Sequence, residues 1–244
     1  MPDFLTQLWR DKLDIIFPRS CVHCGGVVDG DQLRYLCPPC LKLLHLVREP
    51  HCTTCGHPFF GEMTENRECM HCEALVPRFG QGKTAVLLQG AGRSLVHALK
   101  YHGGLHVLED ITAIMRRVPG YADYVRGGVL VPVPLHPAKE EKRQFNQSRL
   151  LAECAAAAAG GEAEVQSMLR RVVNTVSQTH YDRAARQENL KNAFALAPGA
   201  TINPGQRYIL VDDVFTTGST LNSCATVLRR GGALSLDVVT FGHG

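Results

Sequence analysis

The chain has 244 residues, of which 45% are hydrophobic and 20% are charged, and its formal net charge is +3. This is the composition of an ordinary globular protein, and no apolar run approaches the roughly 20 residues that a bilayer-spanning helix needs, so we expect no membrane insertion. The N-terminus carries early acids and lacks the continuous apolar core of a signal peptide, which predicts a cytoplasmic location.

Eight of the ten cysteines lie within residues 21–72. They form four C-x-x-C pairs, namely Cys21/Cys24, Cys37/Cys40, Cys52/Cys55 and Cys69/Cys72. A C-x-x-C turn directs both sulfurs to one point, so two pairs supply the four thiolates of a structural zinc site. The cysteines therefore predict two structural Zn2+ ions. Both shells would be closed, with no open position for catalysis.

The pairs form a repeat with a period near 31 residues. CVHCG and CTTCG both place a glycine (Gly25, Gly56) where such a turn often needs a positive φ, whereas CPPC and CMHC do not. We therefore expect the first four cysteines to bind one ion and the last four the other, with a cross-braced pairing as the alternative. Disulfides are a further alternative, which the missing secretory signal and the regular spacing disfavour. We expect the nearby histidines to be surface residues rather than ligands: His23, His51, His57 and His71.

The chain divides into two expected domains. Phe4, Leu8 and Ile15 recur at helical spacing, which predicts a short amphipathic helix before the ribbons and an N-terminal domain over residues 1–82. The segment after Cys72 looks like a linker, and the second domain is expected over 83–244.

The second domain alternates between apolar β-branched runs and helical patterns. We expect strands at 84–89, 127–134, 207–213 and 233–241, with a possible strand at 165–169. We expect helices at 92–101, 105–117, 146–159 and 219–230. Strands that alternate with helices predict a mostly parallel sheet, and hence an α/β fold.

The stretch YILVDDVFTTGST (208–220) contains the strongest binding signal. Asp212 and Asp213 end a buried strand, where ligands of open parallel sheets bind. The loop that follows leads into a helix N-terminus, which favours anions: Thr216, Thr217, Gly218, Ser219 and Thr220. A ribose 5-phosphate offers its phosphate to such a loop and its hydroxyls to the carboxylates. The alternative is a pair of surface acids followed by an ordinary helix cap.

VDDVFTTGST resembles the phosphoribosyl-diphosphate (PRPP) signature of type I phosphoribosyltransferases. Together with the four C-x-x-C pairs it makes the chain similar to the ComF family, the double-zinc-ribbon competence proteins. Four more stretches match the family pattern, so the resemblance covers nearly the whole chain: FPRSC (17–21), ALKYHGG (98–104), VPVPLHPAKEEKRQFNQS (131–148) and the run 174–194. It implies a phosphoribosyltransferase-like parallel sheet with flanking helices after a double zinc-ribbon domain.

The resemblance also implies roles for residues. Asp212 and Asp213 would hold the ribose hydroxyls, the 216–220 loop the 5-phosphate, and Pro134-Leu135-His136 the diphosphate, where related folds often use a strained backbone. Lys100 and Arg143 are candidate phosphate contacts, with plain surface charge as the alternative.

Three further features belong to this comparison. The run 174–192 resembles the mobile flap, in which Arg183 and Arg186 would neutralise diphosphate or simply be solvated. Asn146 and Gln147 would fix the diphosphate loop or cap the helix. Two departures stand out, Gln144 where the family usually has glycine and the acidic pair Glu140-Glu141 where it is often basic.

The expected ligand is PRPP with Mg2+. If the protein is a pentosyl glycosyltransferase of nucleotide metabolism, it moves phosphoribosyl to an unknown acceptor and releases Mg-diphosphate. The alternative is a non-catalytic PRPP sensor that assists DNA uptake and binds single-stranded DNA or competence-machinery proteins. Residues 1–82 carry 8 Lys+Arg and 10 Asp+Glu, so of the 26 and 23 in the chain the remainder has 18 and 13, a charge of +5 against −2. A polyanion should therefore favour the C-terminal part.

Overall fold

The computed structural model describes residues 19–29, 32–101, 104–172 and 193–244. The strands are β1 (Gly82–Leu87), β2 (Val129–Pro132), β3 (Glu164–Val165), β4 (Leu169–Arg171), β5 (Phe194–Leu196), β6 (Arg207–Phe215) and β7 (Ser235–His243). The helices are α2 (Pro38–Lys42), α3 (Met70–Glu73), α4 (Gly90–Tyr101), the 3-10 turn η1 (Leu105–Val107), α5 (Leu108–Arg117), α6 (Tyr121–Val125), α7 (Pro137–Arg143), α8 (Gln147–Ala158) and α10 (Ser219–Arg230).

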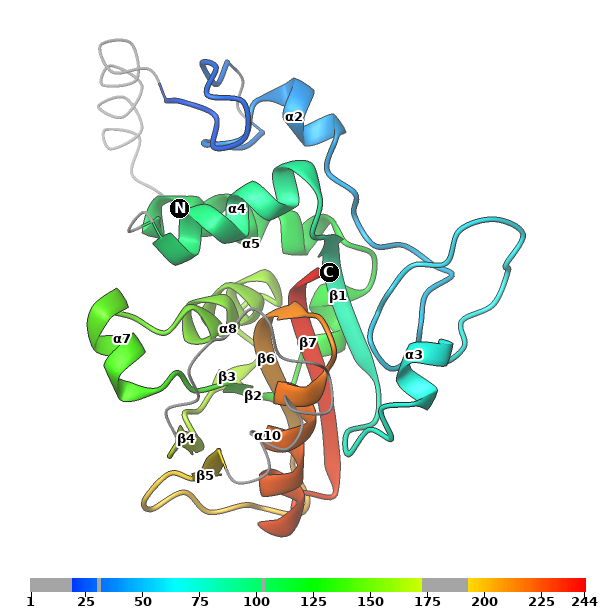
Figure 1. The fold of residues 1–244 in the computed structure, drawn as a ribbon, viewed down its shortest axis with the longest axis vertical. Coiled ribbons are helices and arrows are strands. Elements are labelled where there is room, and N and C mark those ends of the chain that lie inside the picture. The colour runs from blue at the N-terminus through cyan, green and yellow to red at the C-terminus, as the bar shows by residue number, and fades with distance from the viewer. Residues whose placement is uncertain (1–18, 30–31, 102–103, 173–192) are drawn as a thin grey trace.

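Five strands form one parallel sheet in the order β1-β7-β6-β2-β3 (Figure 1). The central strand β6 contains an apolar run, Tyr208 to Val211, as expected for a strand that other elements cover on both faces. β4 and β5 form a separate antiparallel pair. The predicted α/β class, with a parallel sheet after an N-terminal four-cysteine region, is confirmed.

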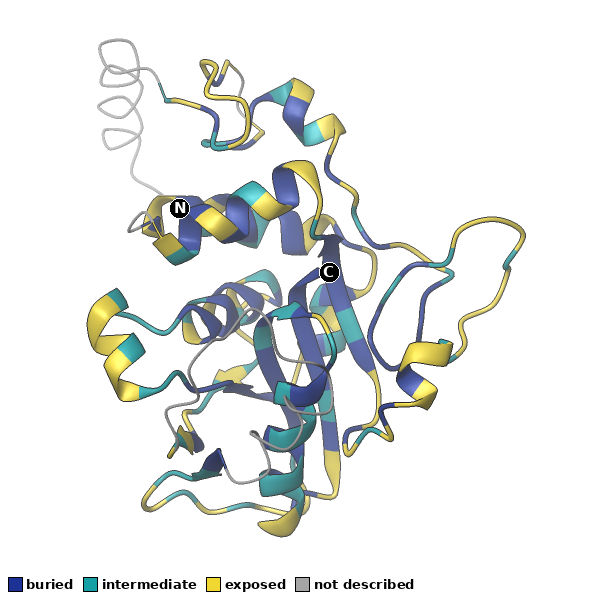
Figure 2. Cartoon of the chain, viewed as in Figure 1, coloured by how far each residue is buried: buried dark blue, intermediate teal, exposed yellow. Residues whose placement is uncertain are grey.

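Two hydrophobic cores lie on the two faces of this sheet. Ile209 and Val211 of β6 belong to the core that contains α4, α5 and α8, whereas Tyr208 and Leu210 belong to the core that contains α10 and the β4-β5 pair. This alternation is the period of two that a strand imposes. Buried residues dominate the strands and the inner faces of α4 and α8, while α7 has no buried residue (Figure 2).

Each cysteine cluster joins a different core. Cys21, Cys37 and Cys40 pack with the α4 and α5 side, and Cys52, Cys55 and Cys72 pack with the α10 side. Figure 1 accordingly shows the first ribbon over α4 and the second beside β1. Between them, residues 45–47 run along β1, with hydrogen bonds from Val47 N–H to Ala85 O (2.9 Å) and from Leu87 N–H to His45 O (3.0 Å). The β1 edge of the sheet is thereby covered at Ala85–Leu87, which disfavours pairing with another chain there.

Most predicted elements occur within a few residues of their expected places, and the helix expected at 219–230 is α10. The prediction of one strand at 165–169 is wrong, because β3 and β4 are separate short strands in different sheets. The segment after Cys72 is not a free linker, since Leu75 and Phe79 are buried in the α10-side core. The domain boundary at residue 82 stays a prediction.

Two expected features lie outside the described residues. They are the N-terminal amphipathic helix and the flap at 174–192 with Arg183 and Arg186.

Candidate functional site

Asp212 and Asp213 lie near the carboxyl end of β6, which continues for two more residues to Phe215. Asp212 Oδ1 accepts hydrogen bonds from the Ser148 hydroxyl and from the Asp213 N–H, each at 2.9 Å. The Asp213 carboxylate forms an ion pair with Lys100 Nζ, at the end of α4. Strand β6 and the ends of α4 and α8 therefore meet at this acidic pair.

The two carboxylates differ electrostatically. Burial raises the pKa of Asp212 to about 8, and the neighbouring charge of Asp213 contributes to the rise, while the bonds from Asp213 N–H and Ser148 oppose it. Asp213 instead has the ammonium group of Lys100 as its partner. In the free protein, burial therefore favours the protonated form of Asp212, and a bound cation or hydroxyl-rich ligand would shift that balance.

The 216–220 loop (Thr216–Thr220) connects β6 to α10. Gly218 has a φ of 71°, in the left-handed region that favours glycine. The Thr217 hydroxyl donates to Ser219 Oγ (3.0 Å), and its oxygen accepts the Ser219 N–H (3.4 Å). The first turn of α10 carries no acidic residue. A twelve-residue helix begins here, so its free N–H groups and positive dipole end favour an anion.

The diphosphate-loop candidate Pro134-Leu135-His136 leaves the sheet beside Asp212. Its start is fixed by Val133 N–H, which donates to Val211 O (2.9 Å), and by Asn146 Nδ2, which donates to Val133 O (3.1 Å). Asn146 Oδ1 also accepts the Ser148 N–H at 2.9 Å. Asn146 therefore does both things expected of it: it fixes the loop and caps α8.

The remaining predicted contacts lie around α7. His136 Nδ1 accepts the Ala138 N–H (3.2 Å) and so caps this helix. Arg143 donates to the buried Gln147 Oε1 (2.9 Å), and its guanidinium stacks over Tyr101 with 5.4 Å to the ring centroid. Within the described residues, cis peptides and positive φ angles are absent from 134–136, so the strained backbone expected there is not observed.

Arg143 and Arg171 both lie within electrostatic reach of Lys139. Burial lowers the pKa of Lys139, and the positive charges of Arg171 and Arg143 lower it further. Burial also lowers the pKa of Arg171, while the Asp212 carboxylate opposes that change. A polyanion placed beside Lys139 would relieve this repulsion.

Gln144 ends α7 with a φ of 67°. This left-handed conformation explains why glycine suits the position in related sequences, since a side chain there is strained. The departure to Gln144 is tolerated: its N–H donates to Glu140 O, closing the last turn.

The eight paired cysteines form two sulfur clusters, in the sequential pairing. The first consists of Cys21, Cys24, Cys37 and Cys40, and the second of Cys52, Cys55, Cys69 and Cys72. Within each, all sulfurs lie within 4.8 Å of one another. A tetrahedral ion with Zn–S bonds of about 2.3 Å requires sulfurs about 3.8 Å apart. The Cys24–Cys37 and Cys55–Cys69 separations of 3.7 and 4.0 Å fit that requirement.

Local geometry supports both clusters. Gly25 and Gly56 have φ angles of 74° and 73°, as the repeat predicts. Cys21 and Cys52 sulfurs accept the N–H groups of Cys37 and Cys69, at 3.5 and 3.4 Å. Such bonds stabilise thiolates around a metal. The clusters are therefore compatible with zinc, and all eight cysteines are free of disulfides.

The two ribbons are attached differently. The first is held by Asp110 of α5, whose carboxylate accepts the N–H groups of Arg34 (2.7 Å) and Tyr35 (2.8 Å). The second is held by β1, where Gly82 N–H donates to Thr53 O (2.8 Å) and the Thr84 hydroxyl to Cys55 O (2.9 Å).

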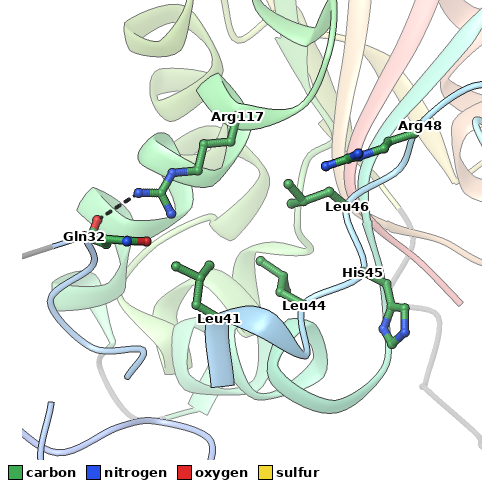
Figure 3. A pocket seen from close by; sticks show the side chains of 7 residues that line it. All are labelled: Gln32, Leu41, Leu44, His45, Leu46, Arg48 and Arg117. Carbon is green, nitrogen blue, oxygen red and sulfur yellow. Dashed lines mark hydrogen bonds between the residues drawn. The ribbon is translucent and has the colours of Figure 1, made fainter. Parts of the chain in front are cut away.

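A pocket also lies between the first ribbon and α5 (Figure 3). Three leucines supply its apolar part, and Arg117, which donates to Gln32 O at 3.3 Å, stands on one side. Its lining is Gln32, Leu41, Leu44, His45, Leu46, Arg48 and Arg117. None of the predicted ligand residues is among them.

Sequence reasoning missed Ser148, Lys139 and Arg171. Ser148 lies two residues after the predicted helix cap Asn146. Its place in the first turn of that helix is the sequence signal that could have identified it. Lys139 and Arg171 stand in charged stretches whose patterns distinguish no single residue. Only the fold brings them within reach of each other, and Arg171 within reach of Asp212.

The double zinc ribbon domain family matches residues 12–74. Competence protein F of Haemophilus influenzae is 37% identical over 226 residues, which cover 91% of this chain and 96% of the relative. Competence protein ComFC of Bacillus subtilis is 27% identical over 221 residues, which cover 84% and 82%.

Among solved structures, the chain is similar to a hypoxanthine phosphoribosyltransferase from Staphylococcus aureus, with a TM-score of 0.34 and 17% identity over 55% of this chain and 62% of that one. Within the described residues, no helix has the length and apolarity to cross a bilayer. The extent and identity of the match to Competence protein F show that this protein belongs to the ComF family of competence proteins.

Proposed function

We propose that the protein binds PRPP with Mg2+ at the carboxyl edge of its sheet and acts in natural competence and DNA uptake. The names of its relatives support the second part. The observation that carries the first is the acidic pair on the central strand, which stands directly before a helix N-terminus. Lys100 pairs with Asp213, and Arg171 lies within electrostatic reach of Asp212.

The 5-phosphate would occupy the 216–220 loop. There it receives N–H groups from the start of α10 and hydroxyls from the threonines and Ser219, as anions at helix N-termini do. The ribose hydroxyls would donate to Asp212 and Asp213, and the negative charge of Asp213, together with that of Asp212 when it is ionised, would exclude the phosphate itself.

The diphosphate would lie toward α7, where Lys139, Arg143 and Arg171 offset its charge. Mg2+ prefers oxygen ligands and is commonly held by one or two carboxylates together with substrate phosphates. Asp212 and Asp213 fit that description. When bound, the ion neutralises charge on the departing diphosphate.

If the protein is an enzyme, the bond from the anomeric carbon to diphosphate breaks and a bond to the acceptor forms. The chain contributes by positioning the sugar and by stabilising the charge that develops on diphosphate. A member that only senses PRPP would bind it without that step. Release of diphosphate in the presence of a panel of nucleobases separates the two.

Calorimetric titration of PRPP with Mg2+ tests the site. The double variant Asp212→Asn/Asp213→Asn should bind at least about tenfold more weakly, since hydrogen bonds to charged groups contribute roughly 1.5–3 kcal/mol each. Asp237→Asn is the matched control, because Asp237 pairs with Arg207, the first residue of β6, at the end of that strand away from Asp212. Equal affinity in wild type and double variant would refute the proposed site.

We propose single-stranded DNA and competence-machinery proteins as partners in the cytoplasm. The excess of positive charge in residues 83–244 and the names of the two competence-protein relatives support this. Binding to phosphates weakens steeply with salt. Single-strand affinity that is measurable in low salt and falls as salt is raised is the expected result, and salt-independent affinity would contradict it.

A further inference from the structure

The chain leaves the second ribbon through residues 74–79, the exit segment, and passes directly over the 216–220 loop. Leu75 and Phe79 of this segment share a buried core with Phe215 and Leu221, which flank the loop. The exit segment therefore connects a zinc ribbon to the candidate phosphate site without an intervening element.

At Gly218 there is no room for a side chain between the loop and the exit segment. A Cβ at this position would lie 2.7 Å from Leu75 Cδ2 and 2.7 Å from Phe215 Cζ, well inside van der Waals contact. The left-handed turn of the loop at Gly218 therefore packs directly against Leu75. Displacement of Leu75 would remove one wall of that turn.

Asn222, in the first turns of α10, holds the exit segment by its backbone. Its Oδ1 accepts the Arg78 N–H at 2.6 Å, and its Nδ2 lies 3.5 Å from Val76 O, to which it donates. The Arg229 Nε–H adds a bond to Arg78 O at 3.0 Å. One helix therefore presents its N-terminus to the ligand and its side to the exit segment.

Val76 has a φ of 49°. A β-branched residue in the left-handed region is a genuine outlier, and the following Pro77 restricts its backbone further. Such strain persists only where the surroundings hold it, and it is concentrated at functional sites. Here the restraint comes from the Asn222 side chain, which bonds to Val76 O and to the Arg78 N–H, while the Val76 side chain itself is exposed.

Aromatic rings link the same elements. Phe79 meets Phe215 edge to face at 6.5 Å between centroids, and His243 stacks on Phe215 at 5.4 Å. His57 of the second ribbon packs against His243 at 4.7 Å. Phe215 immediately precedes the loop, so the ribbon reaches the loop both through the exit segment and through these rings.

We propose that the exit segment of the second ribbon positions the 216–220 loop for a sugar 5-phosphate, with Asn222 and Leu75 as positioning residues. This rests on the proposed function of the loop. The first ribbon has no such role, because Asp110 holds it to α5 on the other face of the sheet.

The test compares Asn222→Ala and Leu75→Ala with wild type in calorimetric titrations of ribose 5-phosphate and of PRPP with Mg2+. Both variants should bind either ligand about tenfold more weakly, a change equivalent to ~1.4 kcal/mol. Asp110→Asn is the matched control: it weakens the attachment of the first ribbon, and it should leave both affinities within about twofold of wild type. Melting temperature and zinc content are measured on the same samples.

A merely structural role predicts that affinity follows melting temperature. The proposal predicts that Asp110→Asn, at a buried site, lowers the melting temperature more than Asn222→Ala while affinity changes only in the latter. Wild-type affinity in both Asn222→Ala and Leu75→Ala would overturn the positioning role and leave the proposed function standing. Absence of binding by wild type would instead refute the proposed function, and the positioning role with it.

Discussion

Asp212→Asn should make the free protein more stable at alkaline pH while it weakens PRPP binding. The carboxylate of Asp212 is buried beside Asp213, and its pKa is raised to about 8. Asparagine keeps an oxygen that accepts the Ser148 hydroxyl and the Asp213 N–H, so the substitution removes the charge and spares the bonds. A charged residue that is kept for ligand binding commonly lowers the stability of the free protein in this way.

The sign of the pH dependence follows from the raised pKa. An unfolded aspartate titrates near pH 4, so between about pH 4 and 8 the folded wild type holds a proton that the unfolded chain has lost. Wild-type stability attributable to Asp212 is therefore present below about pH 4 and is lost as pH rises through about 8. The asparagine of the variant does not titrate, and the difference between variant and wild type should grow across this window.

One pKa unit is worth about 1.4 kcal/mol. Because the two aspartates titrate as a coupled pair, we take a single unit as the minimum gain of the variant at pH 8.5. For a chain of this size that corresponds to roughly 3–6 °C in melting temperature. Urea unfolding of both proteins from pH 6 to 8.5 measures the difference. A difference that is constant with pH, or a variant that is less stable at pH 8.5, would refute the reasoning.

Three other predictions concern the supports of the site. Ser148→Ala should weaken PRPP binding several-fold, because Asp212 loses a hydroxyl donor worth about 0.5–1.5 kcal/mol, and calorimetry against wild type measures it. Gly56→Ala should destabilise the protein more than Gly25→Ala in urea unfolding: both have a positive φ, worth roughly 1–2 kcal/mol, but only at Gly56 would the new Cβ lie 2.6 Å from Thr84 N; equal losses would contradict this contact. Chelation should remove about two zinc ions per chain and change near-UV circular dichroism, because both clusters are part of the two hydrophobic cores; an unchanged spectrum after complete metal removal would contradict that dependence.

The central elements could be predicted because their signals are local. β6 is an apolar run that is bounded by polar residues, and α10 begins after Gly218 and stops at Gly231, so both ends are marked in the sequence. The cysteine pairs with their glycines likewise encode the ribbon turns within a few residues.

The rest depends on contacts between distant parts of the chain. The ion pair of Lys100 with Asp213 and the bond from Ser148 to Asp212 join residues 113 and 64 positions apart. The short helix α7 has no buried residue and therefore no apolar periodicity to detect. The 73–83 segment reads as a linker because a proline and two glycines interrupt it, yet the fold buries Leu75.

The crystallographic position of the 5-phosphate in a complex with PRPP and Mg2+ tests the central claim most directly. The account predicts that the phosphate oxygens accept N–H groups of the 216–220 loop, with the ribose hydroxyls on Asp212 and Asp213. A phosphate bound elsewhere, for example between Arg48 and Arg117 in the pocket of Figure 3, would contradict it.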